Sequence, residues 1–309
     1  VSALSTDTLF ELPTVGDAEL IGVFEHGSPE WHAARMDGIG GSEISAVLDI
    51  SIWESPFSLW HRKAGAVPPR EANTEMEAGR RLEPVICEVF AERHPDLETR
   101  RGGTFRNRQR RWQIANPDQL VYENGRLTAI HEAKFALYPE KFGEEGTDQV
   151  PPYYQAQCRW YADTFGITRT YLTAFVGSTG EFREYVIDAD ADDTALMRER
   201  AEAFMASVAA GIRPPIDGHD ATYRMVKDLP DGLDDIDVEV PVPMRDEYFD
   251  ALARYAAAKT EKQRAASVVL DAIGTGRRAV CFTDPVATRT VRDGKTYSLQ
   301  PARNRGTAA

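Results

Sequence analysis

The chain has 309 residues and a net charge of −13 at pH 7, with 42% hydrophobic and 28% charged residues, as in a soluble globular protein with a full core. It contains no apolar run near the roughly 20 residues that a membrane-spanning helix needs, which excludes integral membrane classes. The cysteines at 87, 158 and 281 are far apart and form no CxxC pair, which excludes a disulfide framework and argues against a four-cysteine Fe–S cluster.

The first residues are acidic and lack the basic n-region of a signal peptide, so we expect a loosely ordered lead-in over 1–27 and a cytoplasmic protein. Residues 30–36 predict a short helix that ends at a run of glycines. Ser42 then stands where the N-cap of the next helix belongs. Residues 55–65 predict another short helix, with a serine cap and a proline at its first position.

Residues 75–94 place apolar side chains at helical spacing, although Pro84 indicates a kink or a restart of that helix. The segment that follows, residues 100–111, holds six arginines and no acid. A run of like charge is most often a solvated surface, but this one directly precedes a strand with candidate catalytic residues. We therefore favour a phosphate-facing role for it, with Arg106 and Arg108 as candidate contacts to a nucleic-acid backbone.

The central strands are predicted at 112–115, 119–122 and 126–135, and the last two form a hairpin around Asn124-Gly125, a strong turn signal. Because side chains alternate along a strand, Glu132 and Lys134 point to the same face, and the hairpin can bring Asp118 beside them. Two carboxylates and a lysine on one surface can hold a hard cation and activate a water.

The rest of the chain alternates between helix and strand patterns. Residues 151–165 predict a helix, 169–187 a strand pair, and 191–210 another helix. Eleven acidic residues against three basic ones lie between 217 and 250. We therefore expect an acidic linker over 217–243, followed by an extension over 244–309 with one long helix and short strands.

Six motifs in order resemble those of the YqaJ-type viral recombinases, phage and prophage alkaline exonucleases that are similar to lambda exonuclease and belong to the PD-(D/E)xK nucleases. The resemblance covers residues 28–216 and rests on WHAARMDGIGGSEISAVL, SPFSLWHRKAG, EAGRRLEPVICEVF, ANPDQLV, HEAKF and VPPYYQAQCRWYADTFG. It implies an α/β fold of the restriction-endonuclease type, in which helices flank a mixed central sheet.

The resemblance also implies a metal site. Asp118 and Glu132 match the carboxylates that bind Mg²⁺, or Mn²⁺, together with the backbone carbonyl of Ala133. Glu83 matches a helix carboxylate that faces the metal, although a surface glutamate is the competing interpretation. Lys134 would either orient and deprotonate the attacking water or stabilise charge on the phosphate, and the sequence does not separate these roles.

Two further matches concern the active site and the DNA end. Gln157 matches a glutamine near the active site, with Gln155 as the alternative if the register is shifted by two residues. Arg35 and Ser42 match residues that bind the 5′-phosphate of a DNA end. Arginine and serine suit this role because both make hydrogen bonds to phosphate oxygens.

The function implied by this family is Mg²⁺-dependent hydrolysis of linear double-stranded DNA from its ends, 5′ to 3′, which leaves 3′ single strands for recombination. The implied partners are duplex ends, a single-strand annealing protein and further copies of the chain in a trimer, with no membrane. Two alternatives stay open: an endonuclease of the same fold, and a DNA-end-binding scaffold that does not cut.

Overall fold

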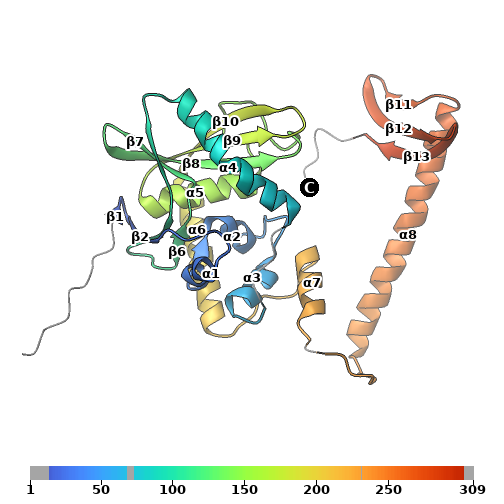
Figure 1. Ribbon diagram of the computed structural model, residues 1–309. Helices are drawn as coiled ribbons and strands as arrows, with labels where there is room; N and C mark the ends of the chain where they lie inside the picture. Colours follow the sequence, from blue (N-terminus) through green and yellow to red (C-terminus); the bar gives the residue numbers. More distant parts are fainter. Residues whose placement is uncertain (1–13, 68–72, 231, 303–309) are drawn as a thin grey trace, which may run out of the picture. The chain divides into compact units, whose positions relative to one another are not determined.

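The computed structural model describes residues 14–67, 73–230 and 232–302 (Figure 1). The chain divides into two compact units, Val1–Gly232 and Leu233–Ala309, here called the first and second units. Among the helices of the described ranges, none combines the length and the apolar character required to cross a bilayer.

The first unit is built from short and medium helices and from strands that are mostly paired antiparallel. Its helices are α1 (Pro29–Met36), α2 (Gly41–Val47), α3 (Pro56–Lys63), α4 (Thr74–Arg93), α5 (Pro152–Phe165), α6 (Ala191–Ala209) and α7 (Asp220–Asp228). Its strands are β1 (Thr14–Val15), β2 (Ala18–Gly22), β3 (Ile39–Gly40), β4 (Glu98–Arg101), β5 (Thr104–Asn107), β6 (Gln113–Ala115), β7 (Gln119–Glu123), β8 (Arg126–Ala136), β9 (Arg169–Val176) and β10 (Glu181–Asp188).

These strands form two mixed sheets. One five-stranded sheet has the order β1-β2-β5-β6-β3, and the other has the order β10-β9-β8-β7-β4. Within the second sheet β8 and β9 run parallel, joined by the crossover through α5, whereas β7–β8 and β9–β10 are antiparallel pairs. The predicted fold class, a mixed sheet flanked by helices, is confirmed (Figure 1).

Helices cover both faces of the second sheet. On one face Phe90 of α4 stacks on His131 of β8, with ring centroids 4.0 Å apart. His131 is fully buried, and its Nε2 lies 2.9 Å from the hydroxyl of Thr173 on β9. Burial lowers the pKa of His131 to about 3. This histidine is therefore a neutral packing residue, as its position on the opposite face from Glu132 predicts.

Helix α5 lies at the centre of the core. Trp160 is fully buried, and its indole N–H donates to the carbonyls of Ile39 and Ile114, 3.1 and 3.0 Å away. These two carbonyls belong to β3 and β6, a parallel pair in the first sheet. One side chain of α5 therefore anchors the helix to the first sheet, while other residues of the same helix face the second.

The structure differs from the sequence expectations at the start of the chain. Of the predicted lead-in over 1–27, residues 1–13 lie outside the described residues. Thr14–Val15 and Ala18–Gly22, however, are strands, and the second of them pairs with β5. The backbone hydrogen bonds of this pairing order the segment, a long-range effect that its acidic, weakly patterned sequence does not reveal.

Three local expectations also differ. Helix α2 is capped by Gly40, so Ser42 lies inside its first turn instead of at the N-cap. Of the kink or restart expected at Pro84, the restart is absent, because helix α4 continues through this residue, and the kink stays a prediction. The expected linker over 217–243 contains α7, which packs on α3 through a 2.6 Å hydrogen bond from the Thr222 hydroxyl to that of Ser55. Contacts between residues that are far apart in the sequence hold α7 in place.

The second unit holds one long helix and a small sheet. Its elements are α8 (Val242–Ile273), β11 (Arg278–Cys281), β12 (Asp284–Arg292) and β13 (Lys295–Pro301). The strands form an antiparallel three-stranded sheet in the order β11-β12-β13. The turn between β12 and β13 holds two residues in the left-handed conformation, Asp293 and Gly294.

Candidate active site

The β7–β8 hairpin brings the predicted carboxylates together. Its turn residues Asn124 and Gly125 have φ values of 50° and 76°, as the tight turn of a two-residue hairpin requires. The register pairs Gln119 with His131, which places Asp118 opposite Glu132. The backbone N–H of Ala133 then donates to Asp118 Oδ2 at 2.7 Å. The side chain of Asp118 thus continues the hydrogen bonding between β7 and β8 beyond the backbone pairs.

Asp118 is also fixed from the other side by Gly102. The amide of Gly102 donates to the backbone carbonyl of Asp118 at 2.9 Å. A Cβ atom on Gly102 would lie 1.8 Å from the carbonyl oxygen of Pro117, so only glycine permits this close approach. The glycine pair that follows the arginines of β4 is therefore part of the construction of the site, although the sequence argument did not use it.

Glu132 is the centre of a buried hydrogen-bond cluster. Its Oε1 accepts one hydrogen bond from Lys134 Nζ and another from Gln157 Nε2, each 2.6 Å long. Gln157 Nε2 also lies 3.2 Å from the hydroxyl of Tyr161, and Lys134 Nζ lies 5.1 Å from the ring centre of Tyr154. Helix α5 thus supplies three side chains to the face of β8 that carries Glu132 and Lys134.

The geometry settles the register of the glutamine on α5. Gln157 is buried and bonds to Glu132, whereas Gln155 bonds to Asp148 in the loop that precedes the helix. The structure therefore places Gln157, and not Gln155, beside the carboxylates.

Three carboxyl groups face one ammonium group in this cluster. Burial, followed by the charges of Glu132 and Glu83, raises the pKa of Asp118 well above its usual range. Burial likewise raises the pKa values of Glu132 and Glu83, against the opposing effect of Lys134. These shifts place Glu83 within the electrostatic reach of the hairpin residues, as the sequence predicted.

The charge of Lys134 follows from the same arrangement. Burial alone would lower its pKa, but Glu132, at 2.6 Å, together with Tyr154 and Asp118, outweighs burial and raises that pKa. Lys134 is therefore an ammonium ion at neutral pH. Of the two roles that the sequence left open, stabilisation of negative charge fits this protonation state better than proton removal from water.

The donor set fits a divalent cation. Glu132 Oε2 is buried and has no hydrogen-bond partner, an arrangement that is costly unless a positive group occupies its free lone pairs. Within the described ranges no three His, Cys, Asp or Glu side chains form a ready-made metal cage. Asp118 and Glu132 would therefore bind a cation that keeps several waters, which is the habit of Mg²⁺. A ligand role for the Ala133 carbonyl stays a prediction.

Arg35 and Ser42 also meet, as predicted. Arg35 Nη2 donates to Ser42 Oγ at 3.0 Å, and the guanidinium lies 4.2 Å from the ring centre of Trp31. The residue before Ser42 joins this pair to the carboxylate cluster. A Cβ on Gly41 would lie 2.3 Å from the ring of Tyr161, the tyrosine that bonds Gln157.

A buried ion network that the sequence analysis missed surrounds Arg35. Glu43 Oε1 accepts from Arg62 at 2.8 Å, and its Oε2 accepts from Lys63 at 2.9 Å and from the Gly40 amide at 2.8 Å. Burial opposes the charge of Glu43, but Lys63, Arg35 and Arg62 hold its pKa well below the usual range. Burial lowers the pKa of Lys63 to about 8. The sequence held one signal for this network: Arg62 and Lys63 lie at the end of a helix and have apolar neighbours.

The structure does not bring Arg106 and Arg108 into the carboxylate cluster. Arg106 Nε donates to Glu19 of β2 at 2.5 Å, and Arg108 donates to the backbone carbonyls of Gly16 and Asp17. Both arginines therefore fasten the N-terminal strands to β5. Arg101, which no sequence argument singled out, is the arginine of this run whose charge reaches Glu83.

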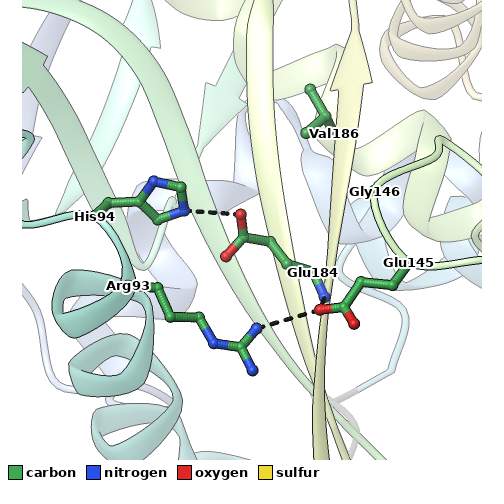
Figure 2. A pocket seen from close by; sticks show the side chains of 6 residues that line it. All are labelled: Arg93, His94, Glu145, Gly146, Glu184 and Val186. Atoms are coloured by element: carbon green, nitrogen blue, oxygen red, sulfur yellow. Dashed lines mark hydrogen bonds and ion pairs between the residues drawn. The ribbon is translucent and has the colours of Figure 1, made fainter.

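A separate cavity of about 290 Å³ lies between the end of α4, the 145–146 loop and β10 (Figure 2). It is closed by a 2.8 Å contact between His94 Nε2 and Glu184 and by an ion pair between Arg93 and Glu145. None of the predicted site residues lines this cavity. Its polar groups are only partly paired, since Glu184 Oε2 is buried without a hydrogen-bond partner, and we assign this cavity no role.

Comparison with known proteins agrees with this geometry. Residues 30–168 match the model of the YqaJ-like viral recombinase domain. Protein YqaJ of Bacillus subtilis (strain 168) is 27% identical over 202 residues, which cover 64% of this chain. The chain spans only 62% of the length of that relative.

Two solved structures are similar in fold. The alkaline exonuclease LHK-Exo of Laribacter hongkongensis is 19% identical, with a TM-score of 0.49 over 66% of this chain and all of that one. The complex of LHK-Exo with dAMP is 18% identical, with a TM-score of 0.50 over 65% of this chain and 97% of the other. At this level of identity the second match shows a shared fold. Residues 30–168 are similar to the YqaJ-like viral recombinase domain family, a match that covers less than half of the chain.

Proposed function

We propose that the first unit is a metal-dependent exonuclease that hydrolyses linear double-stranded DNA from its 5′ ends and leaves 3′ single strands. The observation that carries this proposal is the buried cluster of Asp118, Glu132, Lys134 and Gln157, in which one carboxylate oxygen lacks a partner. The solved neighbours are named alkaline exonucleases, which agrees with the reaction.

Each residue of the cluster has a distinct task in this reaction. Asp118 and Glu132 hold the divalent cation, which is Mg²⁺ or Mn²⁺, and Glu83 is positioned to add a carboxylate or orient a water. The bound cation supplies Lewis-acid activation of the phosphodiester and of water. Gln157 and Lys134 occupy Glu132 Oε1, which leaves Oε2 for the cation. The ammonium of Lys134 stabilises the charge that develops on the phosphate.

Arg35 and Ser42 support the 5′ to 3′ direction of the proposed hydrolysis. An arginine and a hydroxyl within 3.0 Å of each other offer several donors to a terminal phosphate. Recognition of a 5′-phosphate implies an enzyme that starts at ends, whereas an endonuclease has no need of it. We further propose a role in phage or prophage recombination, together with a single-strand annealing protein, and assembly of the chain as a homotrimer on DNA.

The test is digestion of a linear duplex with one 5′-phosphorylated and one 5′-hydroxyl end, in Mg²⁺ or EDTA, beside a closed circle of the same sequence. We expect Mg²⁺-dependent loss from the phosphorylated end and an intact circle. Cutting of the circle would favour an endonuclease, and end binding without any digestion would favour a scaffold. Either result would overturn the proposal.

A pair of lysine variants assigns the chemistry to the cluster. Lys134→Met removes the buried ammonium and should abolish digestion while end binding persists. Lys227→Met removes an exposed lysine of α7 and serves as the matched control, with digestion expected to be unchanged. An unchanged rate for Lys134→Met would mean that the active site lies elsewhere.

A further inference from the structure

Among the described residues, three cations compete for the single buried carboxylate of Glu43. Arg62 occupies Oε1 at 2.8 Å, and Lys63 occupies Oε2 at 2.9 Å together with the amide of Gly40. Arg35 is left 3.6 Å from Oε1, outside hydrogen-bond range. Both oxygens of Glu43 therefore already accept hydrogen bonds, and Arg35 makes only a longer ion pair with this carboxylate.

The competing cations are themselves fixed in place. The Nε and Nη2 groups of Arg62 donate to the two oxygens of Glu54, at 3.0 and 2.9 Å, which directs its third donor group at Glu43. Lys63 donates to the backbone carbonyl of Arg35 at 2.7 Å as well as to Glu43, and its side chain is 1% exposed. Neither cation can leave Glu43 without breaking a second contact.

Arg35 is the cation of this network that makes no hydrogen bond to Glu43, only an ion pair at 3.6 Å. In the described part of the chain, its guanidinium makes one hydrogen bond, to the hydroxyl of Ser42. It packs on the face of Trp31, which orients it without using its N–H donors. The three cations face only two carboxylates, Glu43 and Glu54, so one positive charge remains unbalanced at Arg35.

We propose that Arg62 and Lys63 are positioning residues that saturate Glu43 and thereby keep Arg35 available to bind the terminal 5′-phosphate of a DNA end. This inference rests on the proposed function and deepens it. Removing either cation would vacate one position on Glu43. The carboxylate would then draw Arg35 from the present 3.6 Å ion pair into a hydrogen-bonded one, and Arg35 would be withdrawn from the phosphate.

The test measures the affinity of the full chain, in EDTA, for a short duplex with a 5′-phosphate and for the same duplex with a 5′-hydroxyl. The readout is the dissociation constant for the 5′-hydroxyl duplex divided by that for the 5′-phosphate duplex. This ratio reports the phosphate contact separately from general DNA binding. Arg62→Met, at the more exposed site, is the first variant and Lys63→Met the second. We expect each to reduce the ratio about 10-fold, the effect of losing one charge-assisted hydrogen bond.

The decisive variant is the double substitution Arg62→Met with Glu43→Gln. It removes the competing cation and the carboxylate together, so Arg35 is free again and the ratio should return to that of the wild type. A glutamine can still accept the hydrogen bond from Gly40. Simple structural damage would be increased by a second buried substitution, so recovery identifies competition for Glu43.

Two outcomes would overturn the inference in distinguishable ways. If the wild type binds both duplexes equally, end recognition by Arg35 and Ser42 is wrong, and the proposed function loses its direction as well. If the wild type prefers the phosphate but Arg62→Met and Lys63→Met keep that preference, or the double variant does not recover it, only the saturation of Glu43 is refuted. Circular dichroism confirms that each variant is folded.

Discussion

Replacing Asp118 by asparagine should stabilise the protein when no divalent cation is present. Asp118 is buried beside Glu132 and Glu83, with Lys134 as the one ammonium nearby, and these surroundings raise its pKa well above the usual range. A carboxyl group with a raised pKa on folding destabilises the folded state at any pH above that pKa. Asparagine is similar in shape, keeps an oxygen for the Ala133 amide, and carries no charge.

The size of the effect follows from what the substitution removes. A buried charged group without full compensation costs about 1–3 kcal/mol. For a unit of this size, 1 kcal/mol corresponds to a change of about 2–4 °C in Tm. We therefore expect the melting temperature of Asp118→Asn in EDTA to exceed that of the wild type by a few degrees.

The assay is thermal unfolding at pH 8, in EDTA and in excess Mg²⁺. Mg²⁺ should raise the melting temperature of the wild type, because a ligand at 100 times its Kd stabilises by about 2.7 kcal/mol, and should have little effect on the variant. The difference in melting temperature between the two proteins should therefore shrink or change sign when Mg²⁺ is added. Asp188→Asn is the matched control, since Asp188 is exposed, pairs with Arg169, and has a lowered pKa.

A lower melting temperature for Asp118→Asn in EDTA would refute the argument that the carboxylate cluster stores electrostatic repulsion. Equal responses of wild type and variant to Mg²⁺ would refute the metal site. For the control, removal of a favourable surface pair should change stability by less than about 1 kcal/mol and leave the Mg²⁺ response intact.

Three further predictions follow from single contacts. Gln157→Ala should slow single-turnover hydrolysis about 10- to 100-fold without weakening end binding, because Glu132 loses a 2.6 Å hydrogen bond to a charged oxygen; an unchanged rate contradicts this role. Gly41→Ala should cost about 1–3 kcal/mol in urea unfolding, because the new methyl group meets the ring of Tyr161. The lowered pKa of Glu43 contributes stability above the usual glutamate range, and this contribution is lost as pH falls through the lowered value. Glu43→Gln should therefore flatten the acid limb of a stability curve from pH 6 to 3, and an unchanged limb would contradict the network.

Local sequence rules were sufficient for most of the centre of the site. Strand alternation places Glu132 and Lys134 on one face. The Asn124-Gly125 turn begins the hairpin, but a bulge between Val121 and Tyr122 shifts its register by one residue, and the sequence did not predict that shift. The spacing of the hairpin residues is encoded within about 20 residues of chain, so no knowledge of the remaining fold was needed. Gln157 was harder, because its distance from Glu132 depends on the crossover between β8 and β9.

Contacts between distant segments were not predictable in the same way. The competition for Glu43 depends on how α1, α2 and α3 meet, which no periodicity in the sequence encodes. The arginine run also has a long-range partner that the sequence did not reveal. Contact between Arg106 and a phosphate stays a prediction. In the structure, the Arg106 side chain pairs with Glu19, which lies 87 residues away in the sequence.

The two halves of the candidate site are held by one helix. On α5, Tyr154 lies against Lys134, Gln157 bonds to Glu132, and the ring of Tyr161 packs against Gly41 beside the Arg35–Ser42 pair. These α5 positions recur at intervals of three and four residues, so they lie on one face and span about 10 Å at 1.5 Å per residue. Trp160 fixes the same helix to β3 and β6 through two buried hydrogen bonds. The separation between the carboxylates and the residues proposed to bind phosphate is therefore determined by a rigid helix. The proposed enzyme would require this if binding of a DNA end is to place the adjacent phosphodiester at the proposed metal site.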